Sequence, residues 1–349
     1  MNDVHDGHAP RKRRRRRSSA PLGLLFALVV ALAGSVGLIS ASERLTENFQ
    51  RFEQPEQFEE VLVAVDGPAV NYLLIGSDSR EGTDPNAADA GAVGDVNDVT
   101  GRRSDTIIVL RQERNGEGAA LLSLNRDLWV TQADTGQQDR INSAYNRGVG
   151  VLAQTITQEY GIPINHVVDI DFVGFRDLVD TIGGVTICFE FETRDQASGL
   201  VQPPGCNLLD GTQALAYARS RRYQEFRDGQ WREDPTSDLG RVQRQQQFLA
   251  AAVNETLLDI AADPALVRDL FDATSGSLRL DAALDPLGAA GTLRKAFSSG
   301  LTTYTLPVRG ETIDGKAVLT VIDGPETDEI LNYFRGVGPL PAPETTVPG

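Results

Sequence analysis

From residue 71 onward, short apolar runs alternate with stretches in which apolar residues recur every three or four positions. The short runs predict buried strands at 72–75, 106–110, 119–124, 164–170, 185–189 and 318–322. The periodic stretches predict helices at 146–160, 172–182, 237–260 and 326–334, and Asp210-Gly211 starts a further short helix. Strands that alternate with helices predict one α/β domain, an α-β-α sandwich with a central mixed sheet.

The N-terminal part of the chain has a different pattern. Residues 21–42 are mostly apolar and contain no charge, and about 20 such residues in a helix span the hydrocarbon core of a bilayer. Residues 1–20 carry seven basic and two acidic side chains, which places the N-terminus in the cytoplasm and the rest outside. Small residues near 40–42 leave a cleaved signal peptide as the alternative, but the apolar run is longer than a typical signal core.

These patterns divide the chain into five parts. We expect a cytoplasmic basic tail at 1–20, a transmembrane signal anchor at 21–42, a stalk at 43–68, an extracellular domain at 69–336 and a proline-rich, disordered tail at 337–349. A long loop at 82–101 is rich in Asp, Ala and Gly. Its aspartates do not match the ligand spacing of an EF-hand, so a solvated insertion is the better interpretation.

Composition excludes several classes of protein. The formal net charge is -16, which excludes a globally basic nucleic-acid binder. Two cysteines and three histidines exclude a disulfide-dense scaffold and a zinc site of four cysteines. Cys188 and Cys206 lie in the part expected outside the cell, where they can form a disulfide; two free, buried thiols are the alternative.

Five polar segments lie beside the predicted strands or at helix starts. They are GSDSR (76–80), RSDT (103–106), NRD (125–127), YARSR (217–221) and DLGRVQRQ (238–245). Charges at strand ends in an α/β fold indicate the crevice where ligands bind. The planar guanidinium of Arg suits bidentate contacts to phosphate, and Arg241 and Gln245 are four apart on one helix face, near an N-terminus that favours anions.

The aspartates of these segments complete a possible phosphate site. Asp78 and Asp105 can hold Mg²⁺ together with phosphate oxygens. Enzymes of phosphoryl transfer use Arg side chains and Mg²⁺ to stabilise the negative charge of the transition state. If the short helix stops near Ala218, Arg219 and Arg221 lie in extended chain and point the same way. The chain has 30 Arg and three Lys, so a compositional bias with solvated arginines is the structural alternative. Asp171 is expected to cap the helix at 172–182.

Seven segments, in order, resemble the LytR–CpsA–Psr family of cell-wall glycopolymer transferases. They are NYLLIGSDSR, RSDTIIVL, LLSLNRDLWV, RINSAYNRG, VDIDFVGFRDLVDTIGGV, LDGTQALAYARSR and DLGRVQRQQQFL, between residues 71 and 249. The N-terminal anchor also matches the family's architecture. The resemblance implies that a glycopolymer moves from a polyprenyl-pyrophosphate carrier to the muramic acid 6-hydroxyl of peptidoglycan, so that a phosphodiester forms, and that an apolar tunnel holds the lipid tail.

The resemblance also assigns roles to single residues. Asp78 and Asp105 would coordinate Mg²⁺ or Mn²⁺, and one of them is the general base. The residues that would hold the pyrophosphate or stabilise the transition state are Arg80, Arg103, Arg126, Arg140, Asn142, Arg219, Arg221, Arg241 and Gln245. Of these, Arg103, Arg126, Arg219 and Arg221, with Asp78 and Asp105, would be catalytic.

The sequence departs from the family pattern at two places. Asn125 stands where the family often has proline, and an insertion that contains Trp231 separates Arg221 from Asp238; it is expected to gate the cleft or touch the glycan. The Arg-rich, Lys-poor composition is typical of a GC-rich actinobacterium.

Two other functions remain open at this point. The same residues could form a pyrophosphatase that cleaves polyprenyl pyrophosphate with water. A lipid-binding scaffold without turnover is the other alternative, although the retained Asp78, Asp105, Arg219, Arg221 and Arg241 argue against it.

Overall fold

The computed structural model describes residues 50–52, 55–77, 104–114, 118–235, 240–245, 247–248, 251–252, 278–285, 289, 292 and 301–342. The elements in chain order are β1 (Gln50–Arg51), η1 (Pro55–Phe58), β2 (Ala69–Ser77), β3 (Ser104–Glu113), β4 (Ala119–Leu124), β5 (Trp129–Thr131), β6 (Gln138–Arg140), α4 (Asn142–Arg147), α5 (Val149–Tyr160), β7 (His166–Asp171), α6 (Phe172–Thr181), β8 (Val185–Phe189), β9 (Thr193–Asp195), β10 (Leu200–Gln202), β11 (Gly205–Leu209), α7 (Gly211–Arg219), β12 (Gln224–Arg227), β13 (Gln230–Glu233), β14 (Leu278–Leu280), β15 (Leu301–Thr305), β16 (Val308–Ile313), β17 (Lys316–Val321) and α11 (Pro325–Arg335).

A mixed sheet in the order β1-β14-β7-β2-β3-β4-β15 forms the centre of the domain. β7 runs parallel to β2 and β15 parallel to β4, whereas β3 is antiparallel to both of its neighbours. Every residue of β4 is buried, because helices cover both faces of the sheet. Strands buried on both faces are continuous apolar runs, which is why the sequence pattern located this part of the sheet.

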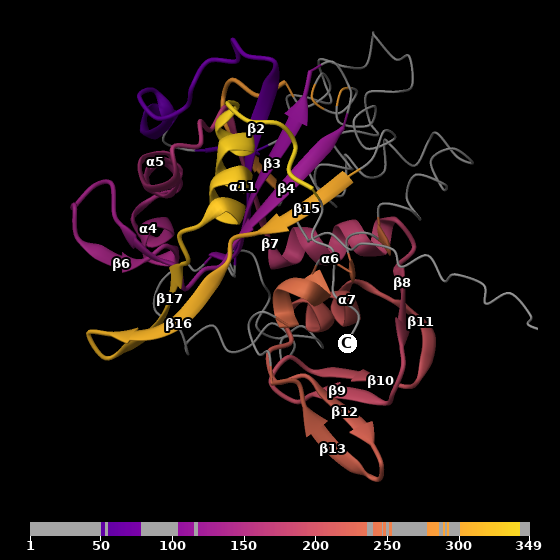
Figure 1. Ribbon diagram of the computed structural model, residues 1–349. Helices are drawn as coiled ribbons and strands as arrows, with labels where there is room; N and C mark the ends of the chain where they lie inside the picture. Colours follow the sequence, from indigo (N-terminus) through magenta and orange to yellow (C-terminus); the bar gives the residue numbers. More distant parts are fainter. Residues whose placement is uncertain are drawn as a thin grey trace, which may run out of the picture.

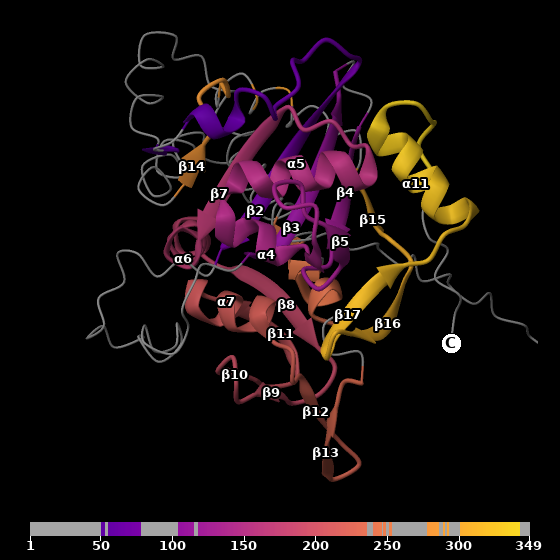
Figure 2. The ribbon, with the colours of Figure 1, turned by 90° about the vertical axis from the view of Figure 1, so that its left-hand side faces the viewer.

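Alternate residues of each central strand enter two separate cores. Tyr72 and Leu74 of β2 pack with α6 and α7, whereas Leu73 and Ile75 pack with α4, α5 and α11. Figure 1 shows α4 and α5 on one side of the sheet and α6 and α7 on the other, and Figure 2 looks across α4 and α5 onto the strands. The prediction of a mixed sheet between two helical layers is therefore confirmed.

Two predicted elements differ from the observed ones. The helix expected at 146–160 is two helices, α4 and α5, because Gly148 between them has φ +141°, a conformation that L side chains rarely adopt. α7 includes Arg219 and ends at Ser220, so Arg219 lies in the last turn of a helix and not in extended chain. Of the helix expected at 237–260, the described residues 240–245, 247–248 and 251–252 are helical.

The folded region extends beyond both expected boundaries. In the segment 43–68, expected to be a stalk, β1 pairs with β14, and Phe52 and Phe58 are buried in the core beside α5. In the tail 337–349, expected to be disordered, Pro341 is buried and its carbonyl accepts a 2.7 Å hydrogen bond from Tyr304 Oη. Apolar side chains in both segments explain why these residues join the domain.

The expected membrane anchor at 21–42 lies outside the described residues. Among the helices that the structure describes, none is long and apolar enough to cross a bilayer.

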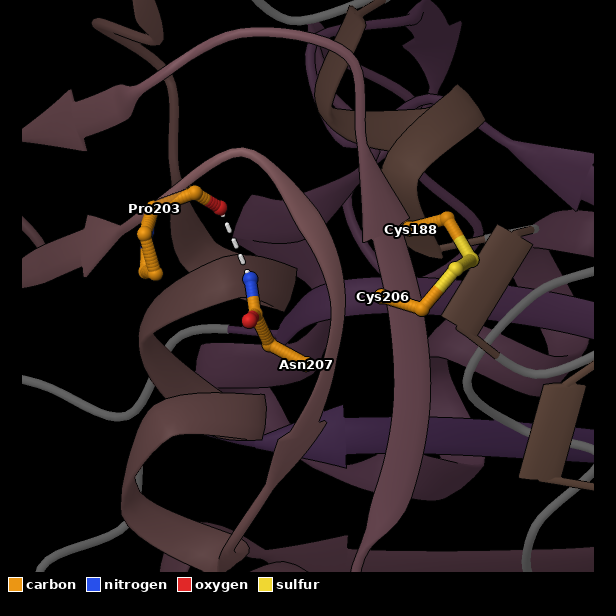
Figure 3. The surroundings of a disulfide bond; sticks show 4 residues. All are labelled: Cys188, Pro203, Cys206 and Asn207. Atoms are coloured by element: carbon orange, nitrogen blue, oxygen red, sulfur yellow. Dashed lines mark hydrogen bonds between the residues drawn. A yellow bond between two sulfur atoms is a disulfide. The ribbon is translucent and has the colours of Figure 1, made fainter.

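A disulfide joins the antiparallel pair β8 and β11. Cys188 and Cys206 stand directly opposite each other in the register, and both residues are exposed. Figure 3 shows the bond beside Asn207, whose Nδ2 donates to the carbonyl of Pro203 over 2.8 Å. The predicted disulfide is therefore present in the structure, and the alternative of two buried, free thiols is wrong.

Candidate functional site

Four of the central strands have a terminus on the same side of the sheet, and we call this row of strand termini the strand edge. β2 ends at Ser77 and β7 at Asp171, which face each other in the register, and β3 begins at Ser104, opposite Ser77. β4 ends at Leu124, next to the start of β3. Neighbouring strands are about 4.8 Å apart, so these four strand ends span about 14 Å.

This edge brings together the polar segments GSDSR, RSDT and NRD. Asp105 lies in β3 between Ser104 and Thr106, which pair with Ser77 and Gly76 across a bulge. Asp78 follows Ser77 directly in the chain. Asp78, Arg80, Arg103 and the side chain of Asp105 lie outside the described part of the structure.

A cavity opens between this edge and the helices α6 and α7. Its polar lining comes from Asp171, Arg219, Arg241 and Gln245, and Gly76 and Thr106 contribute from the strands. The rest of the lining is apolar: Ile170, Phe172, Phe175, Leu215 and Ala218. Two arginines and apolar side chains from the layer between the sheet and these helices thus line the same cavity.

Arg219 enters the cavity from the last turn of α7. Its guanidinium carbon lies 4.7 Å from the centroid of the Phe172 ring, at the start of α6. A stacked guanidinium keeps its N–H groups directed outward along its edge. Phe172 therefore orients Arg219 without using its hydrogen-bond donors.

Hydrogen bonds at the N-terminus of α7, the end opposite to Arg219, fix the position of this helix. Asp210 caps the helix: Asp210 Oδ1 accepts from Gln213 N over 2.8 Å, and Gln213 Oε1 accepts from Asp210 N over 3.2 Å. Gly211 N also donates to Asp180 Oδ1 over 2.7 Å. A Cβ on Gly211 would lie 2.4 Å from the carbonyl oxygen of Arg176, so glycine permits the close contact of α6 and α7.

Asp195 holds the loop that follows Arg219. Its Oδ2 accepts from Ser220 Oγ at 2.7 Å, Arg221 N at 2.9 Å and Arg222 N at 2.8 Å. Burial alone would raise the pKa of Asp195, but these hydrogen bonds hold the pKa below its ordinary value. Asp195 is thus an ionised anchor for the backbone that carries Arg221.

The helical segment 240–245 packs against the same loop. Gln245 Nε2 donates to Ala218 O over 3.1 Å, and Arg244 Nη2 donates to Ser220 O over 2.7 Å. Arg244 Nη1 also donates to Asp234 Oδ2 over 2.8 Å, and its guanidinium lies over the ring of Tyr223. Arg241 is 2% exposed, so this helix delivers a buried cation to the cavity wall.

Arg126, Arg140 and Asn142 form a second cluster, at the end of β4. Asn142 N donates to Arg126 O over 3.2 Å, and both Arg126 and Arg140 lie within 3.6 Å of Asp127. The guanidinium of Arg140 donates twice to Ala317 O in β17, so Arg140 contacts the C-terminal hairpin rather than the cavity. Val242, next to Arg241, lines a separate hollow together with Asn125, which precedes Arg126.

Two acidic residues lie beside the strand ends. Asp171 caps α6 by accepting from Gly174 N over 2.9 Å, as predicted, and burial raises its pKa to about 6. Asp169, two residues earlier in β7, is fully buried and accepts from Tyr145 Oη at 2.8 Å and Arg279 Nη2 at 2.5 Å. Burial raises the pKa of Asp169 although Arg279 opposes this shift.

The residue types near this edge fit a divalent cation. Carboxylates are the hard oxygen ligands that Mg²⁺ takes, alongside phosphate oxygens; Asp105 belongs to β3, and Asp78 follows the last residue of β2 in the chain. Within the residues that the structure describes, no three His, Cys, Asp or Glu side chains are grouped to hold a metal.

The structure therefore joins some predicted site residues and separates others. Arg219, Arg241 and Gln245 line one cavity, whereas Arg126, Arg140 and Asn142 lie together one strand beyond β3. The sequence patterns missed Asp195 and Arg244, because they act on backbone atoms about 25 residues away. Phe172 was recognised only as the start of a helix.

This fold is that of a class of cell-envelope enzymes. The chain is a member of the LytR–CpsA–Psr family: the LytR_cpsA_psr profile matches residues 36–335.

Individual relatives agree with this assignment. The chain is 28% identical over 316 residues to the cell wall biosynthesis protein LcpA of Corynebacterium glutamicum, with 80% of this chain and 58% of that protein covered. It is 28% identical to the polyisoprenyl-teichoic acid–peptidoglycan teichoic acid transferase TagU of Oceanobacillus iheyensis, with 87% and 90% covered. Its fold matches a LytR-Csp2A-Psr enzyme from Actinomyces oris at a TM-score of 0.57 and 25% identity, with 76% and 89% covered.

Proposed function

We propose that the protein is a phosphotransferase that moves a glycopolymer from a polyprenyl-pyrophosphate carrier to peptidoglycan. The acceptor is the 6-hydroxyl of muramic acid. Its oxygen attacks the phosphorus that bears the glycan, and a phosphodiester forms. The bond from this phosphorus to the bridging oxygen breaks, polyprenyl phosphate leaves with the electron pair, and the hydroxyl proton passes to a base.

The cavity lined by Arg219, Arg241 and Gln245 carries this proposal. The guanidinium groups in its lining match the two phosphates, and the apolar part of the lining, with Phe175 and Leu215, matches a prenyl chain. A site for a water-soluble phosphate would need no apolar wall. TagU of Oceanobacillus iheyensis, which the chain spans over 90% of its length, is named for transfer from such a carrier to peptidoglycan.

The arginines supply charge where it develops during the reaction. Arg219, held by Phe172, and buried Arg241 bind the pyrophosphate and stabilise the negative charge on the departing phosphate. Arg221 adds a third cation from the loop that Asp195 fixes. Arg80, Arg103 and Arg126 act from the strand edge, where we place the acceptor hydroxyl.

Asp78 and Asp105 would hold Mg²⁺, with Mn²⁺ as an alternative ion. A bound divalent cation neutralises the pyrophosphate and makes the phosphorus more electrophilic. One of the two aspartates accepts the proton of the attacking hydroxyl.

The reaction takes place at the outer face of the cell membrane. Residues 21–42 anchor the chain as one transmembrane helix, and the basic residues 11–17 remain in the cytoplasm. This topology places the catalytic domain beside both the lipid carrier and the wall.

The test uses the full chain in detergent micelles, with a labelled polyprenyl-pyrophosphate glycan and peptidoglycan oligomers. Mass spectrometry of the products, with Mg²⁺ or with a chelator, should detect glycan joined to peptidoglycan through a phosphodiester. The product should be absent with the chelator and with Arg219→Ala. Release of polyprenyl phosphate without this product would identify a pyrophosphatase instead, and bound lipid without turnover would identify a scaffold.

A further inference from the structure

A second sheet, in the order β10-β9-β12-β13, carries an exposed group of apolar and polar side chains. Cross-strand pairing places its members side by side: Val201 faces Arg194, Arg194 faces Gln224, Gln224 faces Glu233 and Phe226 faces Trp231. Directly opposed residues lie on the same side of a sheet. We call this surface the outer face, formed by Val201, Arg194, Gln224, Glu233, Phe226 and Trp231.

The centre of the outer face is a fixed aromatic platform. The guanidinium carbon of Arg194 lies 3.9 Å from the centroid of the Trp231 ring, and Arg194 Nε donates to Gln224 Oε1 over 2.9 Å. The rings of Phe226 and Trp231 are 5.3 Å apart and tilted by 54°. Trp231 is therefore held by Arg194 and Phe226, and it does not depend on a ligand for its orientation.

The outer face is exposed and carries no net charge. Val201 is 70% exposed and Phe226 40%, and an apolar surface rimmed by polar groups indicates a place for a partner. Arg194 and Glu233 are its charged members, and their charges cancel. An anionic polymer or an anionic membrane would find no electrostatic attraction here.

The outer face is connected to the reaction cavity through the strands β9 and β12. β9 carries Arg194 on this face and, one residue later, Asp195, which binds the loop after Arg219. β12 starts at Gln224, five residues after Arg219. In Figures 1 and 2 the β12–β13 hairpin extends beyond α7, away from the central sheet. A long molecule lying on this hairpin can continue toward the cavity.

We infer that the outer face binds the glycan strand of the acceptor, an uncharged polymer of N-acetylated hexosamines. The C–H face of a sugar ring packs on an exposed aromatic ring such as that of Phe226, which is 40% exposed and lies against Trp231. Hydroxyl and acetamido groups pair with the planar donors and acceptors of Arg194, Gln224 and Glu233. This inference rests on the proposed function, since it assigns the place of the acceptor in that reaction.

Tryptophan fluorescence of the full chain in detergent micelles tests this inference. The chain has two tryptophans, so Trp129→Phe leaves Trp231 as the reporter. Chitopentaose, a soluble oligomer of N-acetylglucosamine, should change the emission of Trp231 saturably. Val201→Gln and Phe226→Gln should each weaken this binding about tenfold. Both side chains are exposed, so neither change threatens the fold.

Leu208→Gln is the matched control. Leu208 is 63% exposed on β11, outside the outer face, and its substitution should leave binding unchanged. The inference is overturned if chitopentaose gives no saturable change, if maltopentaose acts equally well, or if Leu208→Gln weakens binding as much as Phe226→Gln. A response to phosphatidylglycerol vesicles but not to chitopentaose would identify a membrane contact and overturn it too.

A further variant separates this inference from the proposed function. Arg219→Ala should abolish transfer and still bind chitopentaose. Phe226→Gln should raise the KM for peptidoglycan and keep kcat at saturating acceptor. If transfer fails in every assay but the sugar binds, the outer face stands and the proposed reaction falls.

Discussion

Asp195 Oδ2 accepts a 2.7 Å hydrogen bond from Ser220 Oγ, and this contact joins the small outer sheet to the end of α7. Arg221 N and Arg222 N donate to the same oxygen, while Oδ1 accepts from Ala197 N over 2.9 Å. All of these partners are donors. One carboxylate therefore fixes the backbone between the two sheets, just after Arg219.

Asp195→Asn should test this role. The amide has one acceptor oxygen, so its NH₂ group faces a backbone N–H whichever way it turns. We expect the free energy of unfolding, measured in urea, to fall by about 1–3 kcal/mol, and the transfer rate of the folded fraction to fall as well. Asp228→Asn is the control, because Asp228 lies on the exposed turn of β12–β13 at φ 53°, which Asn tolerates. Wild-type stability and rate in Asp195→Asn would refute this role.

Arg219 should respond to the shape of its side chain as well as to its charge. Arg219→Ala removes a cation from the pyrophosphate and should lower the transfer rate by about 100-fold or more. Arg219→Lys keeps the charge but loses the planar group that stacks on Phe172, so the rate should recover only in part. Arg222→Ala, three residues on and exposed, should keep the wild-type rate. Full activity of the lysine variant would show that stacking is irrelevant.

Asp171 should make the stability of the domain depend on pH. Its pKa in the folded state is raised to about 6 by burial, so the folded protein holds this proton more tightly than the unfolded chain does. The contribution of Asp171 to stability is therefore fully present below about pH 4 and is lost as the pH rises through about 6. Asp171→Asn keeps an oxygen to cap α6 and removes the titration.

Urea unfolding of both proteins, with chelator present, measures this difference. Asp171→Asn should match the wild type below about pH 4 and exceed it by about 2 kcal/mol at pH 7. Asp177 also has a raised pKa, but it titrates in both proteins and cancels in the comparison. The charge of Asp169 is itself one of the causes that raise the pKa of Asp171, so its effect is part of the measured difference. A constant difference across this pH range would contradict the assignment.

Local pattern located β2, β3, β4 and β7 of the central sheet, but it did not locate β1, β14 and β15. The runs 119–124 and 185–189 coincide with β4 and β8 because both are short apolar segments with polar ends. The strands of the outer sheet were not predicted. β12 and β13 are half exposed and rich in charge, and their pairing comes from contacts with β9, which a local pattern does not contain.

The residues of the candidate site were also predicted only in part. Spacing and the family resemblance selected Arg219, Arg241 and Gln245, and they line one cavity. Arg140 was selected in the same way, but its guanidinium donates to Ala317 O, 177 residues away in the chain. Whether an arginine faces the cavity or a neighbouring hairpin depends on tertiary contacts of this kind, and neither spacing nor composition encodes them.

The exposed disulfide should stabilise the domain through the unfolded chain. Cys188 and Cys206 close a loop with a sequence separation of 18, and such a loop is worth about 3 kcal/mol. The double variant Cys188→Ser and Cys206→Ser should lose this amount in urea unfolding. Dithiothreitol should lower the wild type to the same level and leave the double variant unchanged. Insensitivity of the wild type to the reductant would show that the bond contributes nothing.

The contact between α6 and α7 should depend on the missing side chain of Gly211. A Cβ there would lie 2.4 Å from the carbonyl oxygen of Arg176 and 2.8 Å from its Cα, both backbone atoms that cannot turn aside. Gly211→Ala should therefore push α7 away from α6, displace Arg219 from Phe172, and lower the free energy of unfolding by about 1–3 kcal/mol.

Gly310→Ala is the control, because no atom lies within 4 Å of a Cβ at that position in β16. There the substitution restricts mainly the unfolded chain, so stability should be unchanged or should rise by up to about 1 kcal/mol. Equal effects of the two substitutions on unfolding and on transfer rate would show that the α6–α7 contact does not position Arg219.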